Sequence, residues 1–178
     1  MLILITGDFG VGKDTIADMF VDYLGDEACK IKSWTTRPPR FEGENTHLFC
    51  DNESAQSFPV SEMVAYCTIG GYSYWTDFSQ FNNKKYEFYV IDIDSVHQVV
   101  SKQKKLPPIV IILVKRPNCL IKVGKTRLNR KREDDDSYFE YPYVNFNVNM
   151  VYNNLSSDLE DLNDDVRMMA EMIRHSFE

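Results

Sequence analysis

The chain has 178 residues, of which 43% are apolar and 26% are charged, and its formal net charge is −7. This length and composition are typical of one soluble globular domain with a sizeable core. The negative charge argues against general binding to nucleic acid or to an anionic membrane, so any phosphate recognition must come from local basic clusters.

The cysteines and the apolar runs of the sequence indicate the cellular compartment of the protein. The cysteines, Cys29, Cys50, Cys67 and Cys119, show no CxxC pair and no histidine spacing suited to zinc. We therefore expect reduced thiols in a cytoplasmic protein. A strand starting at Leu2 predicts that there is no signal peptide, and no apolar run approaches the length of a membrane span.

The first predicted elements are a strand, a glycine-rich loop and a helix. Residues 2–5 form an apolar run suited to a strand buried on both faces, and a helix is predicted over residues 13–24, ended by Gly25. Between them the pattern Gly-x-x-x-x-Gly-Lys predicts a phosphate-binding loop, because its glycines turn backbone N–H groups inward and the helix N-terminus adds about half a positive charge. The candidate phosphate-binding residues are Gly7, Gly10, Val11, Gly12, Lys13, Asp14 and Thr15.

Asp14 departs from the usual pattern, which has Ser or Thr at this position to offer a hydroxyl to magnesium. Asp14 either holds the ion or one of its waters itself, or it is a first-turn residue matched to the helix dipole while Thr15 supplies the hydroxyl. The sequence leaves both interpretations open.

The middle of the chain is predicted to leave the core. A short strand is expected over residues 28–32, followed by an extended loop in which two prolines restrict the backbone over residues 33–40. Residues 41–85 are polar and rich in aromatics, with a turn at Gly70-Gly71, and we interpret them as an irregular, inserted substrate-binding region.

The core resumes with a strand over residues 87–94 that ends in Asp92 and Asp94, and Ser95 is expected to cap the next helix. A central parallel strand is predicted over residues 109–114, a basic helix over 118–132 and a strand over 147–152. The last helix should begin near a capping box at residues 157–160 and bury one face. That face consists of Leu159, Leu162, Val166, Met169 and Ile173. Strands alternating with helices predict an α/β sheet whose ligands bind at the carboxyl ends of the strands.

Further motifs follow the phosphate loop in a fixed order along most of the chain. They are Ser33 with Thr35-Thr36-Arg37-Pro38-Pro39-Arg40, Gly43-Glu44 and Phe49; the run from Gly70 to Thr76; Val90 to Asp94; Arg127 to Arg130; and Met150 to Asn154. With these motifs the chain resembles guanylate kinase. The resemblance implies a single P-loop kinase domain with a parallel-sheet core (residues 1–32, 86–122 and 145–178), an inserted region that binds a nucleoside monophosphate (33–85) and a lid (123–144).

The resemblance also implies transfer of a phosphoryl group from ATP, with Mg²⁺, to a nucleoside monophosphate. The acceptor-binding residues it implies are Ser33, Arg37, Arg40, His47 (in place of the family's tyrosine), Tyr74, Thr76 and Asp94. Asp92 matches an aspartate near magnesium, and Asn153 lies where the family contacts the donor base. The catalytic set would be Lys13, Arg37 and the lid arginines Arg127 and Arg130.

The chemistry of these residues supports that assignment independently. Phosphoryl transfer requires in-line placement and positive charge around the moving group, and Arg37 and Arg40 on a Pro-Pro loop suit bidentate phosphate capture. Two alternatives stay open. The basic stretch over residues 115–132 is either a lid or a solvated helix face, and Asp92 is either a magnesium ligand or a cap for the helix after Ser95.

Some positions depart from the family. Alignment through Tyr74 puts Ala65 where the family reads guanine with a glutamate, with Tyr66 beside it and Glu62 able to substitute only if the register slips. Alanine cannot accept hydrogen bonds from guanine. No further arginine follows Arg132 in the predicted lid. Together with Asp14, these departures suggest an acceptor other than GMP, for example a deoxynucleotide with a pyrimidine or modified base.

Two other functions compete with a nucleotide kinase. Guanylate-kinase-like domains also serve as non-catalytic protein-binding modules, but that alternative predicts a decayed phosphate loop, whereas Lys13 and the loop glycines are present. A kinase for a non-nucleotide acceptor is the other, and the Thr-Thr-Arg-Pro-Pro-Arg segment argues against it. We expect a monomer or homodimer.

Overall fold

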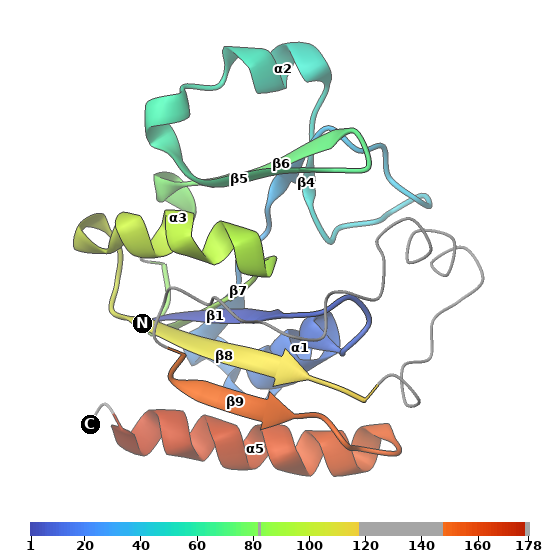
Figure 1. Cartoon of the computed structure of the whole chain (residues 1–178), viewed down its shortest axis with the longest axis vertical. Helices are drawn as coiled ribbons and strands as arrows, with labels where there is room; N and C mark the ends of the chain where they lie inside the picture. Colours follow the sequence, from blue (N-terminus) through green and yellow to red (C-terminus); the bar gives the residue numbers. More distant parts are fainter. Residues whose placement is uncertain (82, 118–147, 177–178) are drawn as a thin grey trace.

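The computed structural model describes residues 1–81, 83–117 and 148–176. The strands are β1 (Leu2–Gly7), β2 (Ala28–Lys30), β3 (Trp34–Thr35), β4 (Leu48–Phe49), β5 (Met63–Ile69), β6 (Tyr72–Asp77), β7 (Tyr86–Val90), β8 (Ile109–Lys115) and β9 (Met150–Asn153). The α-helices are α1 (Lys13–Leu24), α2 (Asn52–Ser57), α3 (Val96–Ser101) and α5 (Leu159–Ser176). Figure 1 shows a core sheet with helices on both faces and a smaller sheet beyond α3.

The core is a five-stranded sheet in the order β2-β7-β1-β8-β9, and every pair of neighbours is parallel. All six residues of β1 are buried, as its apolar sequence predicts for a strand covered on both faces. Alternate residues of β1 enter different apolar clusters: Ile3 and Ile5 pack with α1 and α5, while Leu2 and Leu4 pack with α3. The predicted α/β architecture is therefore present.

The second sheet has the order β4-β3-β6-β5. β5 and β6 form an antiparallel hairpin whose turn is Gly70-Gly71, with φ angles of +58° and +79° that favour glycine. The prediction of an irregular region over residues 41–85 is therefore wrong, although the turn is where we expected it. The sheet escaped detection because β3 and β4 have two residues each and polar or aromatic side chains occupy both faces of β6.

The small sheet contains an aromatic stack. Trp34 on β3 lies opposite Trp75 on β6, with ring centroids 6.3 Å apart and planes inclined by 15°. The Trp34 indole Nε1 donates to Asp77 Oδ2 at 2.9 Å. Phe58, which follows α2, packs against Trp75 at 5.7 Å and extends the stack. These contacts give the small sheet an aromatic core of its own.

Several element ends differ from the predictions. α1 and its Gly25 end are as predicted, but β7 stops at Val90, so Asp92 and Asp94 lie beyond the strand. Asp92, not Ser95, supplies a cap, because its carboxylate accepts from the Ser95 backbone N–H at 3.0 Å. The predicted basic helix over residues 118–132 lies outside the described residues.

α5 buries the predicted face except at its first residue. Leu162, Val166, Met169 and Ile173 are buried together with Ala170, but Leu159 is 65% exposed. The cap is one residue later than predicted, since Asp158 Oδ1 accepts from the backbone N–H groups of Glu160 and Asp161. Leu159 therefore begins the helix outside the core.

No helix in the described part of the chain has the length and apolarity needed to cross a membrane. Cys29, Cys50 and Cys67 are free thiols, while Cys119 lies outside the described residues.

Candidate functional site

The phosphate loop connects β1 to α1 at the carboxyl edge of the core sheet. Gly10 and Gly12 have φ angles of +81° and +101°. Gly7, with φ of +141°, lies so close to β8 that a Cβ built there would be 2.1 Å from the Val114 carbonyl oxygen. The glycines thus allow both the tight turn and the close approach to β8, which is the backbone arrangement that a phosphate-binding nest requires.

The Lys13 side chain folds back over this loop. Its Nζ donates to the carbonyl oxygens of Gly7 at 2.8 Å and Asp8 at 2.7 Å. Burial lowers the pKa of Lys13, and the negative charges of Asp14, Asp8 and Asp92 oppose that shift. The ammonium group is therefore fixed at the loop by main-chain oxygens, with Asp92 within electrostatic range.

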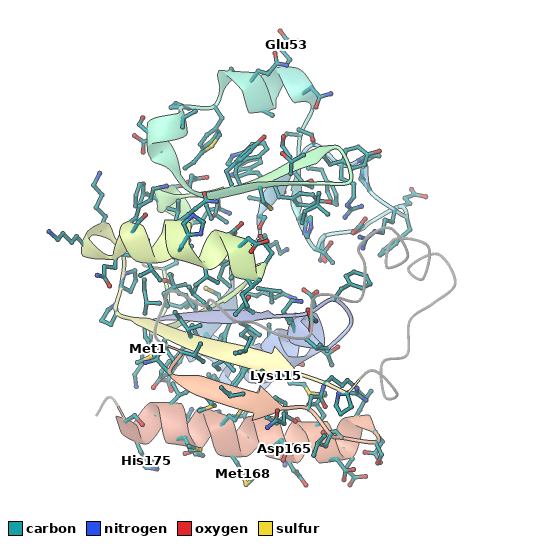
Figure 2. All side chains as sticks on the ribbon, in the orientation of Figure 1. Met1, Glu53, Lys115, Asp165, Met168 and His175 are labelled. Carbon is teal, nitrogen blue, oxygen red and sulfur yellow. The ribbon has the colours of Figure 1, made fainter. Side chains whose placement is uncertain are left out.

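Asn154, the residue directly after β9, anchors the loop and was not singled out from the sequence. Its side-chain Nδ2 donates to the Val11 carbonyl at 2.9 Å, and its backbone N–H donates to the carbonyl of Lys115, the residue labelled at the end of β8 in Figure 2, at 2.7 Å. Asn154 is fully buried, and its Oδ1 has no partner among the described residues. The Asn153-Asn154 pair was the available signal, but we chose Asn153 for a role at the donor base. Asn153 ends β9 and is exposed.

Asp14 lies on the solvent side of the first turn of α1, where its side chain is 77% exposed. It pairs with Lys30 Nζ at 3.1 Å, and Lys30 also contacts Asp18, one turn further along α1, at 2.8 Å. Thr15 is half-buried beside it. A carboxylate near the helix N-terminus is favourable, so this geometry fits the interpretation of Asp14 as a first-turn residue.

Asp92 occupies a central position among the acidic candidates. It caps the turn Ile93–Ser95, and its charge acts both on Lys13 and on the Cys67 thiol of β5. Burial and this neighbouring carboxylate raise the pKa of Cys67 to about 12, so the thiol stays protonated. Asp92 therefore lies within electrostatic range of the phosphate loop and in contact with the small sheet, whereas Asp94 is exposed.

The carboxylate and hydroxyl side chains near the phosphate loop fit the ligand preferences of Mg²⁺. No group of three or more His, Cys, Asp or Glu residues gathers in the described ranges. Magnesium in phosphoryl-transfer sites keeps several waters and takes only one or two carboxylates besides the substrate's phosphates. The half-buried Asp92 close to Lys13 fits that requirement, and the Thr15 hydroxyl is available at the start of α1.

A buried ion pair organises the arginine loop. Arg37 donates to Glu44 through two bonds, Nη2 to Oε1 at 2.7 Å and Nη1 to Oε2 at 3.2 Å, and both side chains are 5% exposed or less. Glu44 also accepts from the Arg40 backbone N–H at 2.6 Å and from the Thr46 hydroxyl at 2.8 Å. Chiefly because of Arg37, the pKa of Glu44 falls to about 2. The sequence analysis gave Glu44 no role.

The Arg37 guanidinium is enclosed by its neighbours: the residue is buried, and its Cζ lies 5.3 Å from the centre of the Phe49 ring. Nη1 donates to Glu44 and to the Pro38 carbonyl, but Nε is buried and has no hydrogen-bond partner among the described residues. Glu44 thus holds both terminal nitrogens of the guanidinium group, and Nε is left as a buried donor without a hydrogen bond among the described residues.

The other predicted acceptor residues lie in three kinds of place: two bond to one buried tyrosine, two pack against each other, and two are exposed. The Ser33 and Thr76 hydroxyls both donate to the buried Tyr89 hydroxyl at 3.4 Å, a residue that sequence reasoning missed. His47 packs edge-on against Tyr74 at 5.5 Å, and burial lowers its pKa. The remaining residues, Arg40 and Asp94, are exposed.

Two electrostatic links connect the acceptor candidates to the loop. The charge of Asp14 acts on His47, and Asp92 acts on Lys13, Cys67 and Tyr89. The lid candidates Arg127 and Arg130 lie outside the described residues.

No protein-family model matches the sequence, and no curated protein matches it. Among solved structures, the guanylate kinase of Anaplasma phagocytophilum is similar, with a TM-score of 0.66 and 18% identity over 99% of this chain and 85% of that one. Its likeness spans the parallel core sheet and the small sheet described above. The chain therefore has the guanylate kinase fold.

Proposed function

We propose that the protein is an ATP- and magnesium-dependent (deoxy)nucleoside monophosphate kinase. The observation that carries this proposal is the phosphate loop, in which glycines at positive φ surround a lysine fixed by two main-chain carbonyls. A non-catalytic module has no need of this arrangement, while a phosphoryl donor requires it. The guanylate kinase fold adds support.

On the donor side, the backbone N–H groups of residues 7–15 and the Lys13 ammonium group bind the ATP phosphates. Asn153 contacts the adenine base of ATP. Asn154 keeps the loop in shape through Val11. Asp92 would hold Mg²⁺, with Thr15 or Asp14 as a further ligand. The ion would neutralise charge on the phosphates when bound.

On the acceptor side, Arg37 and Arg40 bind the monophosphate, assisted by Tyr74 and His47. Glu44 holds Arg37 in one orientation before the acceptor arrives, with Nε as the one donor that has no partner among the described residues. The acceptor-binding set is completed by Ser33, Thr76 and Asp94, and Arg127 and Arg130 are proposed as the arginines that supply positive charge to the transferred group. In this division, residues 33–85 bind the acceptor and residues 123–144 form the lid.

The base specificity is proposed to differ from that of a GMP kinase. Ala65 is 2% exposed and packs in the apolar cluster around α3. It therefore presents no carboxylate to a purine amino group, and the neighbouring Thr76 and Tyr89 offer only hydroxyls. An acceptor whose base needs no carboxylate at the position of Ala65, such as a pyrimidine deoxynucleotide, suits this sequence better than guanine.

The test is incubation with ATP and Mg²⁺ against ribo-, deoxy- and modified monophosphates, with diphosphates detected by mass spectrometry. We expect Lys13→Ala to abolish transfer, while the matched variant Lys104→Ala, on an exposed lysine, keeps it.

Arg37→Ala should also abolish transfer, but it leaves Glu44 buried without its partner, so melting is measured alongside. The exposed Arg40→Ala serves as a second variant that does not disturb the fold. Undiminished turnover in Lys13→Ala would refute the proposal. Absence of any ATP-binding heat in calorimetry would favour the protein-binding module instead.

A further inference from the structure

β5 is the edge strand of the small sheet, and a side-chain amide occupies part of its open edge. Gln98 of α3 accepts from the Tyr66 backbone N–H through Oε1 at 3.0 Å and donates to the Tyr66 carbonyl through Nε2 at 2.8 Å. One glutamine thus makes both bonds that a neighbouring strand would make with that residue. An edge strand without such partners leaves its polar groups unpaired.

A second side chain from the same segment extends this attachment. Lys102, directly after α3, donates from Nζ to the carbonyl oxygens of Met63 at 2.7 Å and Val64 at 2.9 Å. Burial lowers the pKa of Lys102. Together, Gln98 and Lys102 bind four main-chain groups within the first four residues of β5.

Apolar contacts lie beneath these hydrogen bonds. Val64 and Ala65 of β5 and Val96 and Val99 of α3 are buried in one cluster. Figure 1 shows α3 between the small sheet and the core sheet, so it is the element through which the two sheets meet along this side. We call the Gln98 and Lys102 contacts with β5 the α3 clamp.

The α3 clamp connects the two halves of the candidate site. α3 follows the turn that Asp92 caps, and Asp92 acts electrostatically on Lys13 of the phosphate loop. Cys67, the neighbour of the clamped Tyr66, contacts Asp92. A shift of β5 along α3 would therefore displace the Ala65–Cys67–Thr76 face relative to the phosphate loop, because Ala65 pairs with Thr76 in the hairpin.

We propose that Gln98 and Lys102 are positioning residues that set the placement of the acceptor-binding sheet against the phosphate loop. This inference rests on the proposed kinase function. In-line phosphoryl transfer tolerates little misplacement, and an error of about 1 Å costs on the order of a hundredfold in rate. A clamp of main-chain hydrogen bonds fixes the register of β5 without contributing a group to the ligand.

The experiment compares Gln98→Met and Lys102→Met, which keep side-chain length but remove the bonds, with Gln103→Met and Lys104→Met on exposed neighbours. In the clamp variants we expect kcat/KM for the acceptor to fall about tenfold to a hundredfold, with the ATP dissociation constant in calorimetry unchanged. Lys102→Arg, which retains donors, should restore most of the loss. The controls should match the wild type.

Hydrogen exchange at the Tyr66 amide gives a readout that does not need turnover. It should accelerate in Gln98→Met and stay unchanged in Gln103→Met, because only Gln98 bonds that amide. Unchanged acceptor kinetics in both clamp variants would overturn the proposal. So would an equal loss of acceptor and ATP affinity accompanied by a lower melting temperature, since that pattern indicates a merely structural role.

If the wild type transfers phosphate to no acceptor, the proposed function fails. The exchange result then still decides whether the clamp exists in solution, so the two failures are distinguishable.

Discussion

Glu44 shows how a single buried carboxylate can fix the orientation of an arginine side chain. Four donors converge on it: two from Arg37, the Arg40 backbone and the Thr46 hydroxyl. Because all of these favour the ionised form, the folded chain binds a proton at Glu44 less readily than the unfolded chain does.

The pH dependence of stability follows from this. The pKa of Glu44 is lowered from 4.5 to about 2, so its contribution to the free energy of unfolding is fully present above pH 4.5 and is lost as the pH falls from there towards 2. Urea denaturation across this window should show a steeper loss of stability for the wild type than for Glu44→Gln. The exposed Glu53→Gln is the control and should follow the wild type. Parallel curves for Glu44→Gln and the wild type would contradict the prediction.

Asn154 is the second residue whose role can be tested by itself. Asn154→Ala removes the donor to the buried Val11 carbonyl and so loosens the phosphate loop. We expect ATP affinity to weaken by about tenfold, since a buried hydrogen bond is worth about 1 kcal/mol and its loss leaves an unpaired carbonyl. Calorimetry with ATP checks this, with the exposed Asn52→Ala as control. Unaltered affinity in Asn154→Ala would show that the loop keeps its shape without this anchor.

For single residues, the sequence indicates which side chains belong to a local motif better than it indicates which side chains contact one another. The loop glycines and Lys13 follow from a local motif, because their geometry is made within a few residues of chain. Tyr89 and Asn154 were missed because their partners are distant in the sequence: the Asn154–Val11 contact spans 143 positions. Glu44 was missed although its partners lie at most seven positions away, because the loop that joins them carries no periodic pattern that predicts the pairing. Nothing in a local pattern distinguishes Asn154 from Asn153.

Among the helices, the start of α5 differs most clearly from its predicted form. Ser157 had been expected to cap it, but Asp158 accepts the two backbone N–H groups, while the Ser157 hydroxyl donates to Asp161 instead. Asp158→Ala should therefore lower the free energy of unfolding by about 1 kcal/mol, the usual effect of losing a helix cap. Ser157→Ala should cost less. Chemical denaturation measures both, and a larger loss in Ser157→Ala would reverse the assignment.

Helices with a strong apolar periodicity were predicted well, whereas short strands that form only by pairing with a neighbouring strand were not. α1 matches at both ends because its apolar spacing and Gly25 specify it locally. β3 and β4 are too short to carry a pattern and exist only because β6 lies beside β3. The end of β7 was placed too late, since alternation in residues 90–94 continues past the point where the Asp92 cap turns the chain.

For the molecule as a whole, ligand binding and stability should be linked. Saturating ATP at about a hundred times its dissociation constant adds about 2.7 kcal/mol to the free energy of unfolding. For a chain of this size we expect the melting temperature to rise by about 5 to 10 °C. Differential scanning fluorimetry with an external dye checks this, and Lys13→Ala should lose the shift. An equal shift in that variant would place ATP away from the phosphate loop.

The stacked indoles of the small sheet have a practical consequence. Trp34 and Trp75 are the two tryptophans of the chain; Trp34 lies in β3 and Trp75 in β6, the strand that also carries the acceptor candidates Tyr74 and Thr76. Intrinsic tryptophan emission therefore originates wholly in that sheet. A ligand that binds beside this sheet should therefore change the native tryptophan emission, and that change can be followed without a label.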